Sequence, residues 1–124
     1  MQLKGVVVHG KQEARTLGHP TANIEYTAST LPRSGVWTCC MVVKEKTHQG
    51  LAIVGMWNLS NGEPSVEVHL LDFHQDIYGE KIEVSLKGYL RPLEKFETVK
   101  ALKQQIEKDI HRGRAWFHKN TSKV

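Results

Sequence analysis

A short polar segment, Pro20-Thr21-Ala22-Asn23, carries a hydroxyl and an amide side chain two residues apart. If the chain after Pro20 is extended, the side chains of Thr21 and Asn23 lie on the same face. Their oxygen atoms could then ligate a hard cation that already holds phosphate oxygens. On this tetrapeptide alone, a plain turn is the simpler interpretation, because these residue types are also common in turns.

A second candidate for chemistry is Glu67, which stands early in the otherwise apolar run 66–73. A carboxylate held at the mouth of a β-structure could act as the general base toward a hydroxyl nucleophile. The alternative is a glutamate on the solvent face of a strand, and the run by itself favours that alternative. Neither stretch identifies a reaction without the segments around it.

Several common catalytic motifs are excluded. Residues 5–11 match the start of a P-loop, but Gln12 stands where Ser or Thr would hold magnesium, and residues 6–8 have the composition of a strand. The seven histidines show no zinc-binding spacing, and the chain has no G-x-S-x-G elbow. The adjacent Cys39 and Cys40 would point to opposite faces of a strand, so we expect packing residues in a reducing compartment.

The composition is that of an ordinary soluble globular protein, with 124 residues, of which 40% are hydrophobic and 24% charged. This length is enough to bury a core in one domain without a disulfide or a metal ion. No apolar run reaches the roughly 18 residues of a membrane span, and the N-terminus lacks a secretory signal. We therefore expect a cytoplasmic protein that does not bind membranes.

The formal net charge of +4 is compatible with an anionic partner, but many of the basic residues lie from Lys100 onward, as in a solvated helix face and tail. A barrel that binds single-stranded nucleic acid is the alternative of a different class. The aromatic content of 7% supplies few stacking platforms for it, and the strands show no regular interleaving of basic and aromatic residues. We expect no nucleic-acid partner.

Five segments have the residue composition of strands. They are residues 3–8, 36–43, 51–56, 65–73 and 81–90. In the last of them, Ile82, Val84 and Leu86 alternate with polar residues, which predicts a half-buried strand. Turn residues at Asn61-Gly62 and at 78–80 flank the fourth segment. Short strands joined by turns, with no helices between them, predict an antiparallel barrel or sandwich.

One amphipathic helix is predicted over about residues 97–112, because apolar residues recur there at helical spacing. The stripe consists of Val99, Leu102, Ile106 and Ile110. Thr98 is the expected N-cap and Gly113 the expected stop. We expect a single domain over 1–124, with the barrel at about 1–92 and a basic tail at 113–124. The long polar segment 10–24, which contains glycine and proline, is typical of a functional loop.

Taken together, these segments resemble the riboflavin kinases. The matching stretches are 17–24, 31–32, 35–37, 66–73, 76–79, 88–92 through Phe96, then Leu102, 105–106 and Asp109. The resemblance runs from about residue 5 to residue 109 in the right order and spacing. It implies a mainly β fold, namely a six-stranded antiparallel Greek-key barrel with the C-terminal helix packed against it.

The resemblance also implies a reaction, the transfer of the γ-phosphate of ATP to the 5′-hydroxyl of riboflavin. Glu67 would be the catalytic base, and Thr21 and Asn23 would hold Mg²⁺, with Zn²⁺ or Mn²⁺ as alternatives. The residues expected to bind ATP are Gly10, Lys11, Arg15, Gly18, Pro20, Thr21 and Tyr78. Those expected to bind riboflavin are Asn23, Glu67, Arg91 and Phe96. Positioning and charge neutralisation would carry most of the catalysis.

The chain departs from the family pattern at 11–15, where Lys11-Gln12-Glu13-Ala14-Arg15 replaces a loop that is richer in glycine in many members. The segment 10–18 is still expected to close over the ATP phosphates as a flap. No adenylyltransferase domain precedes the barrel in this sequence, so FAD synthesis is not expected. The partners are then riboflavin, FMN, ATP and ADP, and the chain is expected to be a monomer. The alternative within the family is a flavin- or nucleotide-binding barrel that has lost the kinase reaction.

Overall fold

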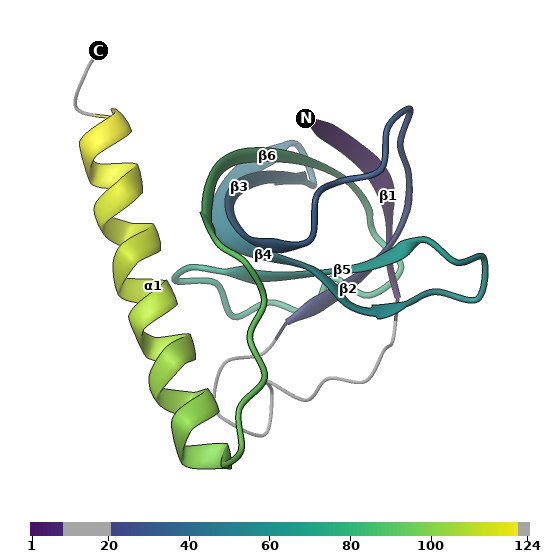
Figure 1. Cartoon of the computed structure of the whole chain (residues 1–124). Helices are drawn as coiled ribbons and strands as arrows, with labels where there is room; N and C mark the ends of the chain where they lie inside the picture. Colours follow the sequence, from purple (N-terminus) through teal and green to yellow (C-terminus); the bar gives the residue numbers. More distant parts are fainter. Residues whose placement is uncertain (9–20, 122–124) are drawn as a thin grey trace.

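The computed structural model describes residues 1–8 and 21–121, which form six strands and one helix (Figure 1). The strands are β1 Gln2–Val8, β2 Ala22–Thr27, β3 Gly35–Val43, β4 Lys46–Asn58, β5 Pro64–Leu70 and β6 Lys81–Arg91. The helix α1 spans Val99–Thr121. All neighbouring strands are antiparallel, and the sheet closes on itself in the order β1-β2-β5-β4-β3-β6.

The topology is a Greek key, because β3, β4 and β5 follow one another as a meander and β6 returns to lie beside β3. The predicted fold class is confirmed. The strand β2 had no counterpart among the five segments predicted from residue pattern. It is short, and it carries Asn23 and Glu25 between its core residues, so only Ile24 and Tyr26 mark it as a strand.

Alternate side chains of each strand point into the barrel. The side chains that do so are mostly apolar and form the core. The alternation predicted for β6 is confirmed, with Ile82, Val84 and Leu86 all at most 4% exposed. Both cysteines are free, and Cys39 belongs to this core. Burial raises the pKa of the Cys39 thiol, which keeps it protonated and unreactive.

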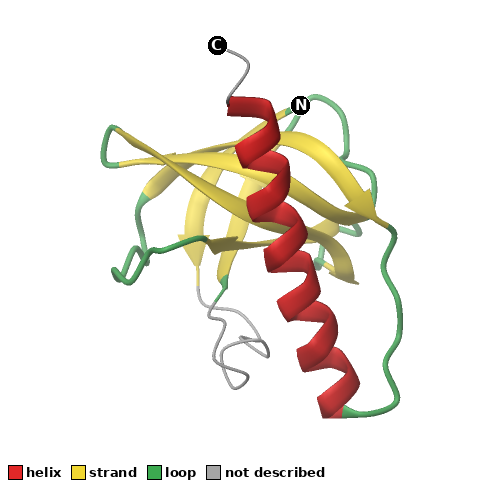
Figure 2. Cartoon of the chain, turned by 90° about the vertical axis from the view of Figure 1, so that its left-hand side faces the viewer, coloured by secondary structure: helices red, strands yellow, loops and turns green. Residues whose placement is uncertain are grey.

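A second apolar layer lies between the outer face of the sheet and α1, which runs along the outside of the barrel (Figure 2). The helix contacts β3, β4 and β6. Val36, Leu51 and Phe117 are buried, yet they do not belong to the cluster inside the barrel. Of these, Leu51 packs directly against the helix at Gly113. Among the described residues, no helix is long and apolar enough to cross a membrane.

The helix begins as predicted, because the Thr98 hydroxyl accepts a hydrogen bond from the Ala101 N–H at 3.1 Å. The predicted end was wrong, however, since α1 continues through Gly113 to Thr121, where a basic tail had been expected. A Cβ atom on Gly113 would lie 2.6 Å from Leu51 Cδ2. The glycine therefore allows the helix to approach β4 closely and does not terminate it.

The predicted apolar stripe also needs correction at its start, because Val99 is 67% exposed. The inward face instead includes Asp109, Gly113 and Phe117, which are all buried. The expected turns at Gly62 and Gly79 are confirmed, with φ of 85° and 82°, which glycine adopts without strain.

Close approach of the helix to β6 depends on Gly88, where an added Cβ would lie 2.5 Å from Nε1 of the Trp116 indole. We predict that Gly88→Ala destabilises the protein by about 1–3 kcal/mol through overpacking. In a Trp116→Leu background the same substitution should cost much less. Urea unfolding of the four proteins in this cycle measures the difference, and an equal loss in both backgrounds would contradict the account.

Candidate functional site

The register of the sheet brings Asn23 and Glu67 side by side. Asn23 of β2 pairs directly with Glu67 of β5, which in turn pairs with Ile53 of β4. The neighbours of these residues along each strand point into the core, so all three point to the outer face. Asn23 and Glu67 are nevertheless each only 6% exposed. A solvent-facing position for Glu67 is therefore excluded.

Thr21 precedes β2 and joins the same group of side chains. Its hydroxyl donates a hydrogen bond to Oε1 of Glu67 at 3.1 Å. The structure thus brings together the predicted base and the two predicted metal-binding residues, although they come from segments 46 residues apart in the sequence. Their individual roles stay predictions.

The side-chain amide of Asn23 is the unusual member of the group. Among residues 1–8 and 21–121, neither its Oδ1 nor its Nδ2 has a hydrogen-bond partner, although both atoms are buried. Burying an amide without partners costs free energy, so a site that keeps one has a use for its polar atoms. A ligand that supplies the missing partners would remove this penalty.

The oxygen atoms of Thr21, Asn23 and Glu67 suit a hard divalent cation. Among the residues that the structure describes, no group of three or more His, Cys, Asp or Glu side chains could hold a metal ion. These few oxygen atoms suit a cation such as Mg²⁺, which usually keeps several other ligands such as phosphate oxygens and water.

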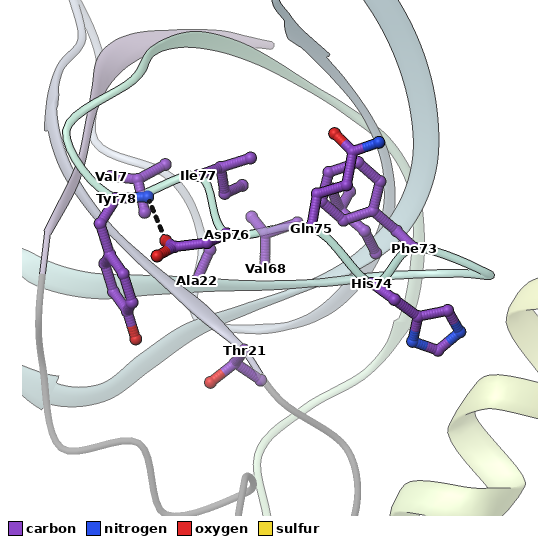
Figure 3. A pocket seen from close by; sticks show the side chains of 11 residues that line it. Val7, Thr21, Ala22, Val68, Phe73, His74, Gln75, Asp76, Ile77 and Tyr78 are labelled. Carbon is purple, nitrogen blue, oxygen red and sulfur yellow. Dashed lines mark hydrogen bonds between the residues drawn. The ribbon is translucent and has the colours of Figure 1, made fainter.

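A cavity of about 430 Å³ opens next to this group, at one end of the barrel (Figure 3). Its floor consists of core side chains, including Val7, Ala22 and Val68. Thr21 lines one side, and the segment 73–78 lines the other. The volume is in the range of small-molecule sites. Two residues predicted to bind ATP, Thr21 and Tyr78, therefore share one cavity.

Residue pattern alone did not assign the remaining wall of this cavity to a site. Phe73, His74, Gln75, Asp76 and Ile77 belong to the β5–β6 connection. The Asp76 carboxylate accepts a hydrogen bond from the Tyr78 N–H at 3.0 Å, which fixes the turn. A polar connection directly after the strand of Glu67 was the available signal, since such loops often carry function.

Five of the predicted ATP-binding residues lie outside the described part of the chain. They are Gly10, Lys11, Arg15, Gly18 and Pro20, and the predicted flap 10–18 lies there too. Phe96, predicted to contact riboflavin, is half-buried in the connection between β6 and α1. Its flavin contact stays a prediction.

Arg91, also predicted to bind riboflavin, forms a two-pronged ion pair with the helix. Its Nε and Nη2 donate to the two carboxylate oxygens of Asp109 at 2.8 and 2.7 Å, and its Nη1 donates to the Pro92 carbonyl at 3.0 Å. The hydrogen bonds to Asp109 raise the pKa of Arg91. Gln105 donates a further hydrogen bond to Asp109. A carboxylate on the buried face of an amphipathic helix was the signal for this pair in the sequence.

Comparison with known proteins relates this site to one family. The family model for riboflavin kinase matches residues 1–117. The chain is 42% identical over 120 residues to a bifunctional riboflavin kinase/FMN adenylyltransferase of Listeria monocytogenes, and the match covers 94% of this chain but 38% of that protein. The chain therefore spans well under half the length of that relative.

Two solved structures share the fold. A Streptococcus pneumoniae protein described as a macrolide-efflux protein matches with a TM-score of 0.84 and 34% identity, over 93% of this chain and 38% of its own. A riboflavin kinase from Trypanosoma brucei matches with a TM-score of 0.67 and 24% identity, over 95% of this chain and 80% of its own. At that identity the second match shows the fold alone.

The unpartnered amide leads to a prediction about stability. We expect Asn23→Val to leave the free energy of unfolding unchanged or higher, because a buried amide without partners is lost. The matched control is Thr38→Val, since the buried Thr38 hydroxyl accepts a hydrogen bond from the Gly88 N–H at 2.8 Å. That change should cost about 1–3 kcal/mol. Chemical denaturation compares the two, and an equal loss at Asn23 would show that its amide contributes to the folded state.

Proposed function

The chain belongs to the riboflavin kinase family, and from that premise we propose that it transfers the γ-phosphate of ATP to the 5′-hydroxyl of riboflavin, forming FMN and ADP. One observation carries the proposal. Glu67, Thr21 and Asn23 lie together beside a cavity of nucleotide-binding size. They supply a buried carboxylate, a hydroxyl that is hydrogen-bonded to it, and a buried amide that has no hydrogen-bond partner among the described residues. This arrangement offers a base, oxygen ligands and a binding site within one small region.

Glu67 is the proposed general base. As the riboflavin 5′-hydroxyl attacks the γ-phosphorus, its proton passes to a carboxylate oxygen of Glu67, and the bond from phosphorus to the bridging oxygen of ADP breaks. The Thr21 hydroxyl donates a hydrogen bond to Oε1 of this carboxylate. That bond also fixes the orientation of the carboxylate, which favours one direction of attack.

Thr21 and Asn23 are the proposed ligands of the divalent cation, which is Mg²⁺ in our proposal, with Zn²⁺ or Mn²⁺ as alternatives. When bound, such an ion neutralises charge on the phosphate oxygens. The residues themselves supply a hydroxyl and an amide oxygen that the fold already holds in place on β2 and just before it. Pre-placed ligands spare the site the entropy of ordering them on binding.

The nucleotide is proposed to occupy the 430 Å³ cavity, with Tyr78 on its wall. Thr21 lines this cavity and also contacts Glu67, so the phosphates would reach the base at this residue. Lys11 and Arg15 would contact phosphates through their side chains, Gly10 and Gly18 would contribute backbone N–H groups, and Pro20 would border the nucleotide.

Riboflavin is proposed to lie on the outer face of the barrel, between Glu67 and the β6–α1 connection that contains Phe96. Ile53 pairs with Glu67 in register, and Val36 pairs with Ile53, so the surface that extends from the base toward β6 is apolar. An apolar floor with a carboxylate at one end suits a flat aromatic ring system that carries a polar chain.

The base assignment is tested by Glu67→Gln, which keeps the shape of the side chain and removes the proton acceptor. We predict that turnover falls by roughly 10²–10⁴-fold while riboflavin affinity stays nearly unchanged. Chromatography of FMN and a riboflavin binding titration give the two quantities. Near-normal turnover in this variant would exclude Glu67 as the base.

The cation site is tested by Thr21→Val, which removes the hydroxyl and keeps the branched shape. We predict a loss of about tenfold or more in Mg²⁺-dependent ATP affinity, with much less effect on riboflavin affinity, because one ligand of the ion is missing. Calorimetric titration of ATP with and without Mg²⁺ measures it, with Asn23→Val as the second variant. If both variants bound Mg²⁺–ATP like the wild type, these residues would not be ligands.

A further inference from the structure

One guanidinium group joins the start of the β6–α1 connection, residues 92–98, to the middle of the helix that follows it. Arg91 precedes the connection, and its Nη1 donates to the carbonyl of Pro92, the first residue of the connection. The Nε and Nη2 atoms of the same side chain bind Asp109 on the helix that follows the connection. Figure 1 shows the connection running from β6 to the start of α1.

This connection passes close to the outer-face residues that neighbour Glu67. A Cβ atom on Gly55 of β4 would lie 3.7 Å from Cδ1 of Leu93, so Leu93 lies over that strand. Gly55 is two residues beyond Ile53, which pairs with Glu67. A displacement of the connection would therefore change the surface beside Ile53, next to the proposed base.

The strand register connects Arg91 with the proposed base, Glu67, through a row of paired residues that runs across the sheet. The row consists of Asn23, Glu67, Ile53, Val36 and Arg91, each paired with the next across adjacent strands. Arg91 lies three strand spacings from Glu67, about 14 Å along the sheet and half-way round the closed barrel, so the guanidinium does not reach the reacting atoms.

A second ion pair between α1 and the barrel provides an internal comparison. Arg114 binds both carboxylate oxygens of Asp72 at 2.9 Å. In this second pair the two side chains are 48% and 77% exposed. In the pair of Arg91 and Asp109 they are 13% and 6% exposed. An exposed pair of this kind contributes little, whereas breaking a buried pair leaves an uncompensated charge.

We propose that Asp109 is a positioning residue for riboflavin, which acts through Arg91 by holding the connection 92–98 against the outer face of the barrel. The inference rests on the proposed function for the identity of the ligand. It deepens that function, because a helix residue outside the reacting group would set the affinity for the flavin. Gln105, which donates to the Asp109 carboxylate at 3.0 Å, supports this arrangement.

The test compares Asp109→Asn with the matched control Arg114→Gln, using riboflavin fluorescence titrations without ATP and steady-state kinetics of the full chain. For Asp109→Asn we expect the riboflavin Kd and KM to rise about tenfold or more. The connection 92–98, no longer held in place, would misplace its contacts with riboflavin. The KM for ATP and the kcat at saturating riboflavin should stay within about threefold of the wild type. For Arg114→Gln, all four quantities should stay within about twofold.

Deuterium uptake separates positioning from general destabilisation. In Asp109→Asn, amides of residues 93–98 should exchange faster while those of the barrel strands keep wild-type rates, and Arg114→Gln should leave both unchanged. Unchanged riboflavin affinity in Asp109→Asn, or an equal loss in Arg114→Gln, would overturn the inference. If Asp109→Asn is unfolded at the assay temperature, Asp109→Glu replaces it under the same criteria, because the longer side chain keeps the charge but displaces the carboxylate from the guanidinium fork.

The outcome for the wild type separates this inference from the proposed function. Wild-type chain that binds riboflavin and forms FMN, with no loss of riboflavin affinity in Asp109→Asn, would overturn only the positioning role. Wild-type chain that neither binds riboflavin nor forms FMN would overturn the proposed function and the inference with it.

Discussion

Closure of the six-stranded sheet is the constraint on which the site depends, because closure leaves no strand free to slip. In an antiparallel pair, a shift of one residue turns every side chain to the opposite face. Such a shift in β5 would place Glu67 inside the barrel and Val66 and Val68 outside it, at a large cost in buried apolar area. The same inward packing that stabilises the fold therefore fixes Asn23 and Glu67 as neighbours on the outer face.

The helix α1 packs on the outer face of the barrel, against β3, β4 and β6. Gly88 and Gly113 let α1 lie close to the sheet, and the Arg91–Asp109 pair joins the helix to β6. On β2 and β5, Asn23 and Glu67 are each only 6% exposed although they point to the outer face. In a less polar environment, charge interactions are stronger than in water, which suits the roles proposed for the Glu67 carboxylate and for the cation.

The sequence predicted the parts of the fold that depend on local pattern. The alternation of Ile82, Val84 and Leu86 and the cap at Thr98 are properties of a few neighbouring residues, and the structure confirms both. Gly113 failed as a predicted helix end because its role is set by contact with Leu51, which is distant in the sequence. The meeting of Thr21 with Glu67, and of Arg91 with Asp109, likewise depends on register and packing across the barrel. The resemblance to the family suggested which residues matter, whereas local pattern alone favoured a turn and a solvent-facing glutamate.

The central claim is that the buried Thr21–Asn23–Glu67 group and the adjacent cavity form a kinase site for riboflavin. Incubation of the chain with riboflavin, ATP and Mg²⁺, followed by chromatographic separation of the flavins, tests it most directly. The account predicts FMN and ADP in equal amounts, formed only when both ATP and the divalent ion are present. Riboflavin that is bound but recovered unchanged would contradict the claim and would leave the fold as a flavin-binding barrel without the transfer reaction.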